Sequence, residues 1–154
     1  MDNRLFRDAM GKFATGITVV TTKDEHGEVH GITVNAFMSV SLEPKLIAIS
    51  IDNKASLYQT LQKTKQFGIS VLTEKQKDYS MIFAKQMDKP EKINFTSLDG
   101  NPVLKDSLVT LSCFVKETAT AGDHMIFIAE VTELNMDDAK PLLYFGGKYN
   151  QIRE

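Results

Sequence analysis

The chain has 154 residues, of which 42% are hydrophobic and 25% charged, with a formal net charge of -2 at pH 7. A chain of this length buries about two-thirds of the surface exposed by its unfolded form, so we expect one domain over residues 1–154. The nearly balanced charge gives no reason to expect nucleic acid or an anionic membrane as a partner. No run of about 18 apolar residues and no secretory segment is present, which predicts a cytoplasmic protein.

The N-terminal segment has helical periodicity and is followed by β-rich sequence. Apolar residues recur at helical spacing over residues 2–14, with Asp2 or Asn3 available as the N-cap, and Gly16 ends the predicted helix. Residues 17–22 are rich in β-branched side chains, which fit a pleated sheet. A turn at residues 24–27 leads to a second strand at residues 28–33, so this pair predicts a hairpin.

The middle of the chain alternates between strands and helices. We expect strands at residues 37–42 and 46–51, helices at residues 56–64 and 74–85, and a short apolar strand at residues 67–72 between the helices. Residues 87–102 are rich in turn-forming Asp, Pro and Gly, which predicts an irregular segment.

The last third has the clearest strand pattern. Residues 108–117 alternate between apolar and polar side chains, a turn is expected at residues 119–123, and residues 124–134 return as the second arm. A final short strand is expected at residues 142–145. About seven strands with three marginal helices and mostly tight turns predict a mainly β fold, an antiparallel closed or nearly closed barrel.

Several kinds of catalytic site are unsupported by the sequence. There is no GxGxxG after a strand, no GxxxxGK[ST] and no GxSxG. The histidines His26, His30 and His124 lack zinc-site spacing, and no metal is expected. Cys113, the only cysteine, lies mid-strand on the expected core face, so we expect a buried, inert thiol rather than a nucleophile.

Polar side chains gather in two turns on either side of the strand at residues 46–51. Thr33, Asn35, Ser39 and Ser41 precede this strand, and residues 52–56 follow it. Because one short strand joins the two turns, their hydroxyl and backbone N–H groups should lie close together. This arrangement suits a neutral or anionic ligand held by many weak donors, although two ordinary strand ends have the same pattern.

Five further side chains are candidates for ligand contacts. Lys54 and Ser56 open the helix that begins near Ala55, where free N–H groups attract phosphate, although Ser56 as a simple N-cap beside a solvated Lys54 is the alternative. His124 follows Gly122 and Asp123, which could supply a positive φ and orient the ring. Its imidazole could donate to a ligand, or it could be a strand-end histidine with no role. Tyr144 and Tyr149 could stack on a planar ligand or pack one end of the barrel.

In order and spacing, these segments resemble the flavin reductase-like proteins of the FMN-binding split-barrel superfamily, which include the reductase components of two-component flavin monooxygenases. The segments that carry the resemblance are FRDAMGKFATGITVVTT at residues 6–22, TVNAFMSVSLEPKLIAISID at residues 33–52, FGISVL at residues 67–72, Phe83-Ala84, GDH at residues 122–124 and PLLYFGGKY at residues 141–149. The resemblance implies an antiparallel split β-barrel that forms a homodimer, with flavin in a groove near the subunit interface.

The resemblance also implies roles for individual residues. The flavin ring and ribityl chain would lie along Thr33, Val34, Asn35 and Ala36, with Ser39, Val40 and Ser41 beside the ribityl or phosphate end. The isoalloxazine edge would be lined by Ser50, Ile51 and Asp52, the phosphate would lie near Asn53, Lys54 and Ser56, and the groove would be closed by Phe83 and Ala84. The nicotinamide nucleotide would meet His124 and Tyr149, and His124 would orient it or help protonate the reduced flavin, with orientation the preferred role.

Three positions depart from the family pattern. Ala36 stands where the family usually has Ser, so one hydroxyl contact to the flavin is lost. Ser70 replaces a common Asn, which changes a local hydrogen bond. Residues 88–93 replace a more usual Asp-Arg-x-Phe pattern, which leaves the choice between FMN and FAD open.

The implied activity is an NAD(P)H:flavin oxidoreductase that reduces FMN or FAD with NADH or NADPH and supplies an oxygenase partner. The cofactors carry such chemistry, which explains a chain without an evident acid–base pair or nucleophile. A flavin carrier or redox sensor without nicotinamide turnover is the alternative, and the GDH segment favours the reductase. The sequence lacks the ligand residues that a heme or pyridoxal-phosphate barrel would need. Since no arginine cluster surrounds the proposed phosphate, we expect a flavin that can dissociate.

Overall fold

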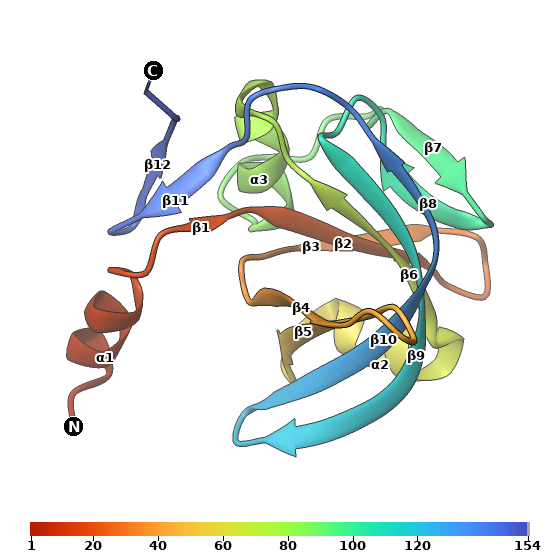
Figure 1. Ribbon diagram of the computed structural model, residues 1–154, viewed down its shortest axis with the longest axis horizontal. Helices are drawn as coiled ribbons and strands as arrows, with labels where there is room; N and C mark the ends of the chain where they lie inside the picture. The colour runs from red at the N-terminus through yellow and green to blue at the C-terminus, as the bar shows by residue number, and fades with distance from the viewer. Residues whose placement is uncertain (154) are drawn as a thin grey trace.

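Seven antiparallel strands form the body of the protein, which the computed structural model describes over residues 1–153 (Figure 1). They join in the order β3-β2-β6-β9-β10-β5-β4. Their bounds are β2 Thr18–Lys23, β3 Val29–Val34, β4 Phe37–Ser41, β5 Leu46–Asp52, β6 Gln66–Val71, β9 Val109–Ala121 and β10 His124–Met136. The edge strands β3 and β4 are not paired with each other in this part of the chain, so the barrel is split. The predicted split barrel is confirmed, and the sheet does not close.

Most predicted strands of this sheet agree with the observed bounds to within one residue, but the β9–β10 hairpin is longer than predicted. Its strands run to Ala121 and from His124, so only Gly122 and Asp123 are left for the turn. The Thr-Ala sequence before the turn has weak strand character on its own. It is held by pairing, with Thr118 opposite Phe127 and Ala121 opposite His124. Cross-strand partners therefore decide this boundary.

Two smaller sheets flank the main one. β1 Thr15–Gly16, β11 Leu143–Phe145 and β12 Lys148–Asn150 form a three-stranded sheet in the order β1-β11-β12, and β7 Phe95–Leu98 pairs with β8 Asn101–Leu104. The irregular segment predicted for residues 87–102 is therefore wrong in its second half. The Asp99-Gly100 pair that looked like a loop signal is the two-residue turn of the β7–β8 hairpin. β12 was not predicted.

Three short helices lie at the margins: α1 Asn3–Met10, α2 Ser56–Thr64 and α3 Lys77–Phe83. The predicted bounds of α2 are confirmed. α1 ends four residues before the predicted end, because Gly11 follows it and the next two N–H groups bond to carbonyls only three residues back. The predicted helix at residues 74–85 is a 3₁₀ turn, Glu74–Gln76, followed by α3.

No helix within residues 1–153 is long and apolar enough to cross a bilayer.

The apolar faces of the strands form two hydrophobic clusters. The larger one lies between the main sheet and α2, and it contains Leu57, Leu61, Phe67 and Phe127. Cys113 belongs to this cluster and is 1% exposed. Burial raises the pKa of its thiol to about 12, so it is protonated and unreactive near neutral pH, as expected. The smaller cluster lies under α3, β8 and β11 and contains Ile17, Val19, Leu72, Phe83, Leu104 and Leu142.

Gly68 allows β6 and β8 to approach each other closely. A Cβ atom on Gly68 would lie 2.1 Å from the carbonyl oxygen of Pro102 and 2.7 Å from Cγ1 of Val103. Only glycine fits this contact, because neither the backbone carbonyl nor the buried valine can move aside cheaply.

We expect Gly68→Ala to lower the free energy of unfolding by about 2–3 kcal/mol, since β8 must shift away from β6. Gly16→Ala is the matched control, because a Cβ at Gly16 would meet no atom within 4 Å. The control should stay within about 0.5 kcal/mol of the wild type. Urea unfolding followed by circular dichroism measures both, and equal losses would contradict the proposed contact.

Candidate functional site

The two predicted polar turns lie on either side of β5. On one side β4 pairs with β5, with Phe37 opposite Ile49, and the N–H of Ser50 donates to the carbonyl of Ala36 at 3.1 Å. The connection between β3 and β4 therefore lies directly beside Ser50. Its residues Asn35 and Ala36 are exposed, so their backbone and side chains are accessible to a ligand.

On its other side, β5 pairs with β10 and brings His124 to the second polar turn. His124 lies opposite Asp52 in the register of the two strands, and the N–H of Asn53 donates to the carbonyl of Asp123 at 3.0 Å. The N–H of Lys54 donates to Asp52 Oδ1 at 2.9 Å, which fixes the turn that follows β5. Asp52 and His124 are far apart in the sequence, yet they lie side by side at one end of the paired strands β5 and β10.

A carboxylate holds the imidazole of His124. Asp123 Oδ1 lies 2.7 Å from His124 Nδ1, and this hydrogen bond is the main cause that lowers the pKa of Asp123, with a smaller contribution from the charge of Lys54. An ionised Asp123 accepts a hydrogen bond, so Nδ1 is assigned as the donor and Nε2 stays free for a ligand. Both side chains are solvent-exposed, which keeps this contact weak but leaves the ring accessible.

The start of α2 supplies free backbone N–H groups beside this turn. Its N-cap is Ala55, which has no side-chain oxygen, and Ser56 is the first helical residue. The alternative of Ser56 as the N-cap is therefore wrong. An uncapped helix start of this kind, with an exposed serine hydroxyl and Lys54 nearby, has the donors that an anion needs.

An open groove of about 690 Å³ connects the start of α2 with the end of α3 along the unpaired edge of β3. It is lined by Glu28, Val29, His30, Gly31, Ser56, Ile82, Phe83, Lys85, Gln86, Met87, Asp88 and Lys89. Two predicted residues, Ser56 and Phe83, thus share one groove. Phe83 packs so closely on β3 that a Cβ on Gly31 would lie 2.7 Å from its ring. Ala84 follows at the exposed end of α3.

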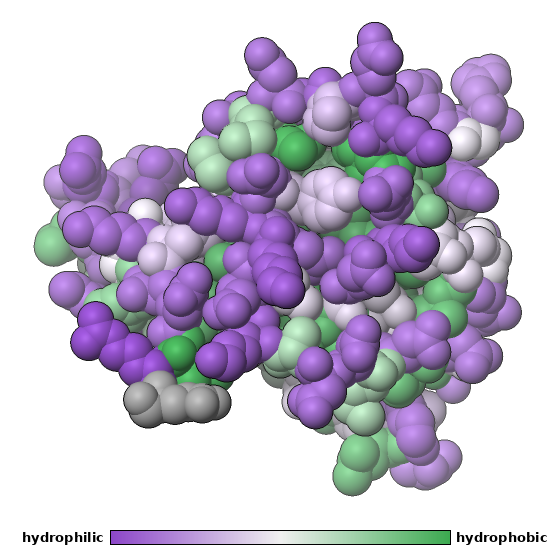
Figure 2. Space-filling view, turned by 90° about the horizontal axis from the view of Figure 1, so that it is seen from above, coloured by the Kyte–Doolittle hydropathy of each residue, from purple (hydrophilic) through white to green (hydrophobic). Residues whose placement is uncertain are grey.

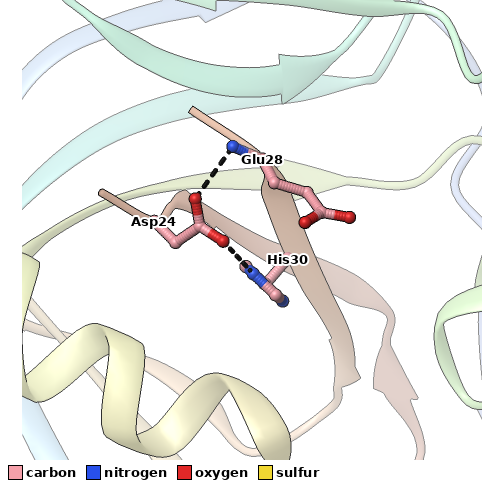
Figure 3. A group of neighbouring side chains, drawn as sticks. All are labelled: Asp24, Glu28 and His30. Atoms are coloured by element: carbon pink, nitrogen blue, oxygen red, sulfur yellow. Dashed lines mark hydrogen bonds and ion pairs between the residues drawn. The ribbon is translucent and has the colours of Figure 1, made fainter. Parts of the chain in front are cut away.

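The sequence did not indicate His30 and the lysines of this groove as site residues. His30 is fixed by the turn of its hairpin: its Nε2 lies 2.8 Å from Asp24 Oδ2 (Figure 3). Asp24 Oδ1 accepts the N–H of Glu28 at 3.0 Å, and the hydrogen bond to His30 is the main cause that lowers the pKa of Asp24. One ligand atom each of Asp24, Glu28 and His30 lies within 4.8 Å of the others. Hydrogen bonds within the hairpin account for this arrangement.

Tyr149 lies at the other end of the molecule from His124. It belongs to β12, whereas His124 begins β10 at the tip of the β9–β10 hairpin, and Figure 1 shows these segments well separated. The structure therefore does not bring the two predicted nicotinamide contacts together within one chain. The Tyr149 ring meets Tyr144 edge-on at 5.4 Å between centroids, and both rings pack against the smaller hydrophobic cluster.

Tyr149 is nevertheless linked to the proposed flavin loop. Its hydroxyl lies 2.9 Å from Ser80 Oγ in α3, and the Ser80 carbonyl accepts the hydroxyl of Thr33 at 2.7 Å. Val34, next to Thr33, is buried and its carbonyl accepts the hydroxyl of Thr18 at 2.6 Å. The end of β3 is therefore held firmly before the exposed loop begins.

Comparisons with known proteins agree with this architecture. A family model described as a flavin reductase-like domain matches residues 10–153. An NADH-dependent flavin reductase of a Rhodococcus species is 38% identical over 148 residues, covering 95% of this chain and 84% of the relative. An NADH-dependent flavin reductase of Pseudomonas fluorescens is also 38% identical, over 97% of this chain and 90% of the relative.

Solved structures have the same fold over the whole chain. A flavin reductase determined in its native state superposes with a TM-score of 0.97 at 51% identity, covering 100% of both chains. An NADH:FAD oxidoreductase of Streptomyces globisporus, solved in complex with NAD and FAD fragments, superposes with a TM-score of 0.91 at 30% identity, covering 98% of this chain and 93% of that one.

Proposed function

We propose a flavin site and a nicotinamide site for this chain, which belongs to the family of flavin reductase-like domains. The protein is a flavin reductase that oxidises a reduced nicotinamide nucleotide and supplies reduced flavin to a partner monooxygenase. We place this activity in the cytoplasm. The observation that carries the site is the register of β5 and β10, which sets His124 opposite Asp52 at the turn leading into α2.

The proposed flavin lies across the exposed end of β5 and its flanking turns. Support comes from the accessible loop beside Ser50 and from the uncapped start of α2, which suits a phosphate. The contacts would come from Thr33, Val34, Asn35, Ala36, Ser39, Val40, Ser41, Ser50, Ile51, Asp52, Asn53, Lys54, Ser56, Phe83 and Ala84. Residues 33–56 contain no arginine, so apart from Lys54 the flavin would be held by neutral donors and released readily. A flavin dissociation constant in the low nanomolar range would contradict this release.

Among flavins, the groove along β3 favours FAD. The start of α2 has donors for one phosphate, and the groove of about 690 Å³ extends from it, with Lys85, Lys89, Glu28 and Asp88 as its charged lining residues. FMN carries a single phosphate, whereas FAD carries a second phosphate and an adenosine, which need additional space and donors such as these lysines. We accordingly propose FAD as the preferred flavin and NADH as the preferred reductant, the latter because similar reductases are NADH-dependent.

The protein's own residues position the reactants. The nicotinamide and the flavin, when bound, supply the hydride-transfer chemistry themselves. Asp123 fixes the ring of His124 through Nδ1, which leaves Nε2 to contact the nicotinamide nucleotide and orient it. Backbone N–H groups of the loop after Thr33 stabilise negative charge at the pyrimidine side of the flavin. Orientation of this kind contributes about 7–11 kcal/mol in well-aligned systems, so no acid–base pair is needed.

The test of the function is a nicotinamide oxidation assay. Purified protein is mixed with NADH or NADPH and with FMN or FAD, and the near-ultraviolet absorbance of the reduced nicotinamide is followed. We expect turnover, fastest with NADH and FAD. Bound flavin without turnover by either nucleotide would instead support a carrier or redox sensor of the same fold.

The same assay measures the role of His124. We expect His124→Ala to slow flavin reduction by about 10- to 100-fold in stopped-flow mixing with NADH, because an orienting contact is lost. The flavin dissociation constant should change less than about threefold, because the flavin contacts remain. The control is His26→Ala, which removes an exposed histidine from the β2–β3 turn. Loss of flavin binding in His124→Ala would contradict the proposed division of roles.

We also propose a homodimer, in which α1 packs against the second chain. On the face shown in Figure 2, apolar side chains form separate patches among polar ones. α1 is different: none of its residues is buried, although Leu5, Phe6 and Met10 are 62%, 54% and 57% exposed. An eight-residue helix is marginal in water by itself, so an apolar partner surface accounts for its formation.

We expect Phe6→Asp to weaken the dimer at least about 30-fold, because an aromatic contact is replaced by a buried charge. Gln59→Glu adds the same charge on the exposed face of α2 and is the control. Sedimentation velocity at micromolar concentration measures the change. A monomeric wild-type protein, or equal effects of both substitutions, would overturn the dimer proposal.

A further inference from the structure

Ser80 connects two residues of the proposed flavin site with Tyr149, which the family resemblance assigns to the nicotinamide nucleotide. It lies in the middle of α3 and is 1% exposed. Its side-chain Oγ is 2.9 Å from the hydroxyl of Tyr149, on the proposed nicotinamide side. Its backbone carbonyl accepts the hydroxyl of Thr33 at 2.7 Å and the N–H of Ala84 at 3.1 Å, both on the proposed flavin side. No ligand can reach a residue so deeply buried, so any role of Ser80 acts through these neighbours.

The helix fixes the Tyr149 ring at two points. Lys77 lies one helical turn before Ser80, on the same face of α3, and its Nζ is 5.3 Å from the centroid of the Tyr149 ring. Ser80 holds the hydroxyl at the far end of the same ring, and Tyr144 meets the ring edge-on. A partly buried tyrosine needs a partner for its hydroxyl, and here that partner comes from the element that also holds the end of β3.

We propose that Ser80 is a positioning residue for the reductase reaction: its side chain sets the Tyr149 ring for the nicotinamide nucleotide, while its carbonyl sets Thr33 for the flavin. This inference rests on the proposed function for the flavin assignment of Thr33, and on the family resemblance for the contact between Tyr149 and the nicotinamide nucleotide. The two roles use different atoms of one residue. A substitution can therefore remove the first role and leave the second in place.

Ser80→Ala removes Oγ and keeps the carbonyl, so binding of the nicotinamide nucleotide and binding of the flavin should respond differently. We expect the KM for NADH to rise about five- to tenfold, the size expected for one lost buried hydrogen bond, with kcat changed less than about twofold. The flavin dissociation constant should stay within about twofold of wild type. Tyr149→Phe removes the same hydrogen bond from the other side and should give the same split, and the double variant should be no worse than either single one.

Ser112→Ala is the control for a purely structural effect. Ser112 is also 1% exposed, and its Oγ accepts a hydrogen bond from Asn101 Nδ2 at 2.8 Å, far along the chain from α3. This variant should lower the unfolding temperature as much as Ser80→Ala while leaving the KM for NADH at the wild-type value.

The outcomes separate the inference from the function on which it rests. A wild-type protein without nicotinamide turnover would overturn the proposed function itself. With turnover present, a KM for NADH in Ser80→Ala no higher than in Ser112→Ala would overturn only the role of Ser80. Additive effects of Ser80→Ala and Tyr149→Phe would do the same, because they would show that the two hydroxyls act separately. If Ser80→Ala fails to fold, the KM for NADH in Tyr149→Phe alone decides between these outcomes. Tyr149 is half-buried, so loss of its hydroxyl should leave the protein folded.

Discussion

The antiparallel pairing of β10 with β5 is the constraint on which the candidate site depends. Seven consecutive residue pairs, from His124 opposite Asp52 to Glu130 opposite Leu46, hold the two strands in register. A slip of either strand by one residue would turn its core side chain, Ile49 of β5 or Phe127 of β10, out of the core, so burial of the apolar face fixes this register firmly. The same register then places the turn after β5, the start of α2 and the imidazole at the same end of these two strands. Packing in the core thus determines the geometry at the surface.

The sequence predicted the parts of this arrangement that depend on local pattern. Runs of β-branched residues and alternating polarity located the main strands, and the helical spacing after Ser56 located α2, because those patterns reflect which face is buried. The β7–β8 hairpin was missed because Pro102 and Asp99-Gly100 indicate turns whether or not short strands flank them. Its second strand packs closely on Gly68 of β6, a residue far away in the sequence. The end of α1 was placed too late because apolar spacing continues past Gly11, although glycine there disfavours the helix whatever the spacing.

The candidate site was predictable to the extent that it follows from strand order. The polar residues around β5 could be read from the sequence, since neighbouring strands must bring their ends together. The groove could not, because it forms where the end of α3 meets the edge of β3 and depends on the fit of Phe83 over Gly31. The sequence also did not predict the hydrogen bonds between Ser80 and Tyr149 and between His30 and Asp24. Each joins residues whose proximity is a consequence of tertiary packing, and neither has a characteristic spacing.

The alanine at the N-cap of α2 has a consequence for the working protein. A serine, threonine, aspartate or asparagine at that position stabilises a helix by about 1 kcal/mol relative to alanine, and Ala55 forgoes this contribution. The unpaired amides are thereby kept open for a ligand, and an anion seated there would restore what the missing side chain does not supply. The thermal stability of this enzyme would then rise when an anion occupies the start of α2. After each turnover in which the reduced product leaves for another protein, the empty enzyme would be slightly easier to unfold until the next ligand binds.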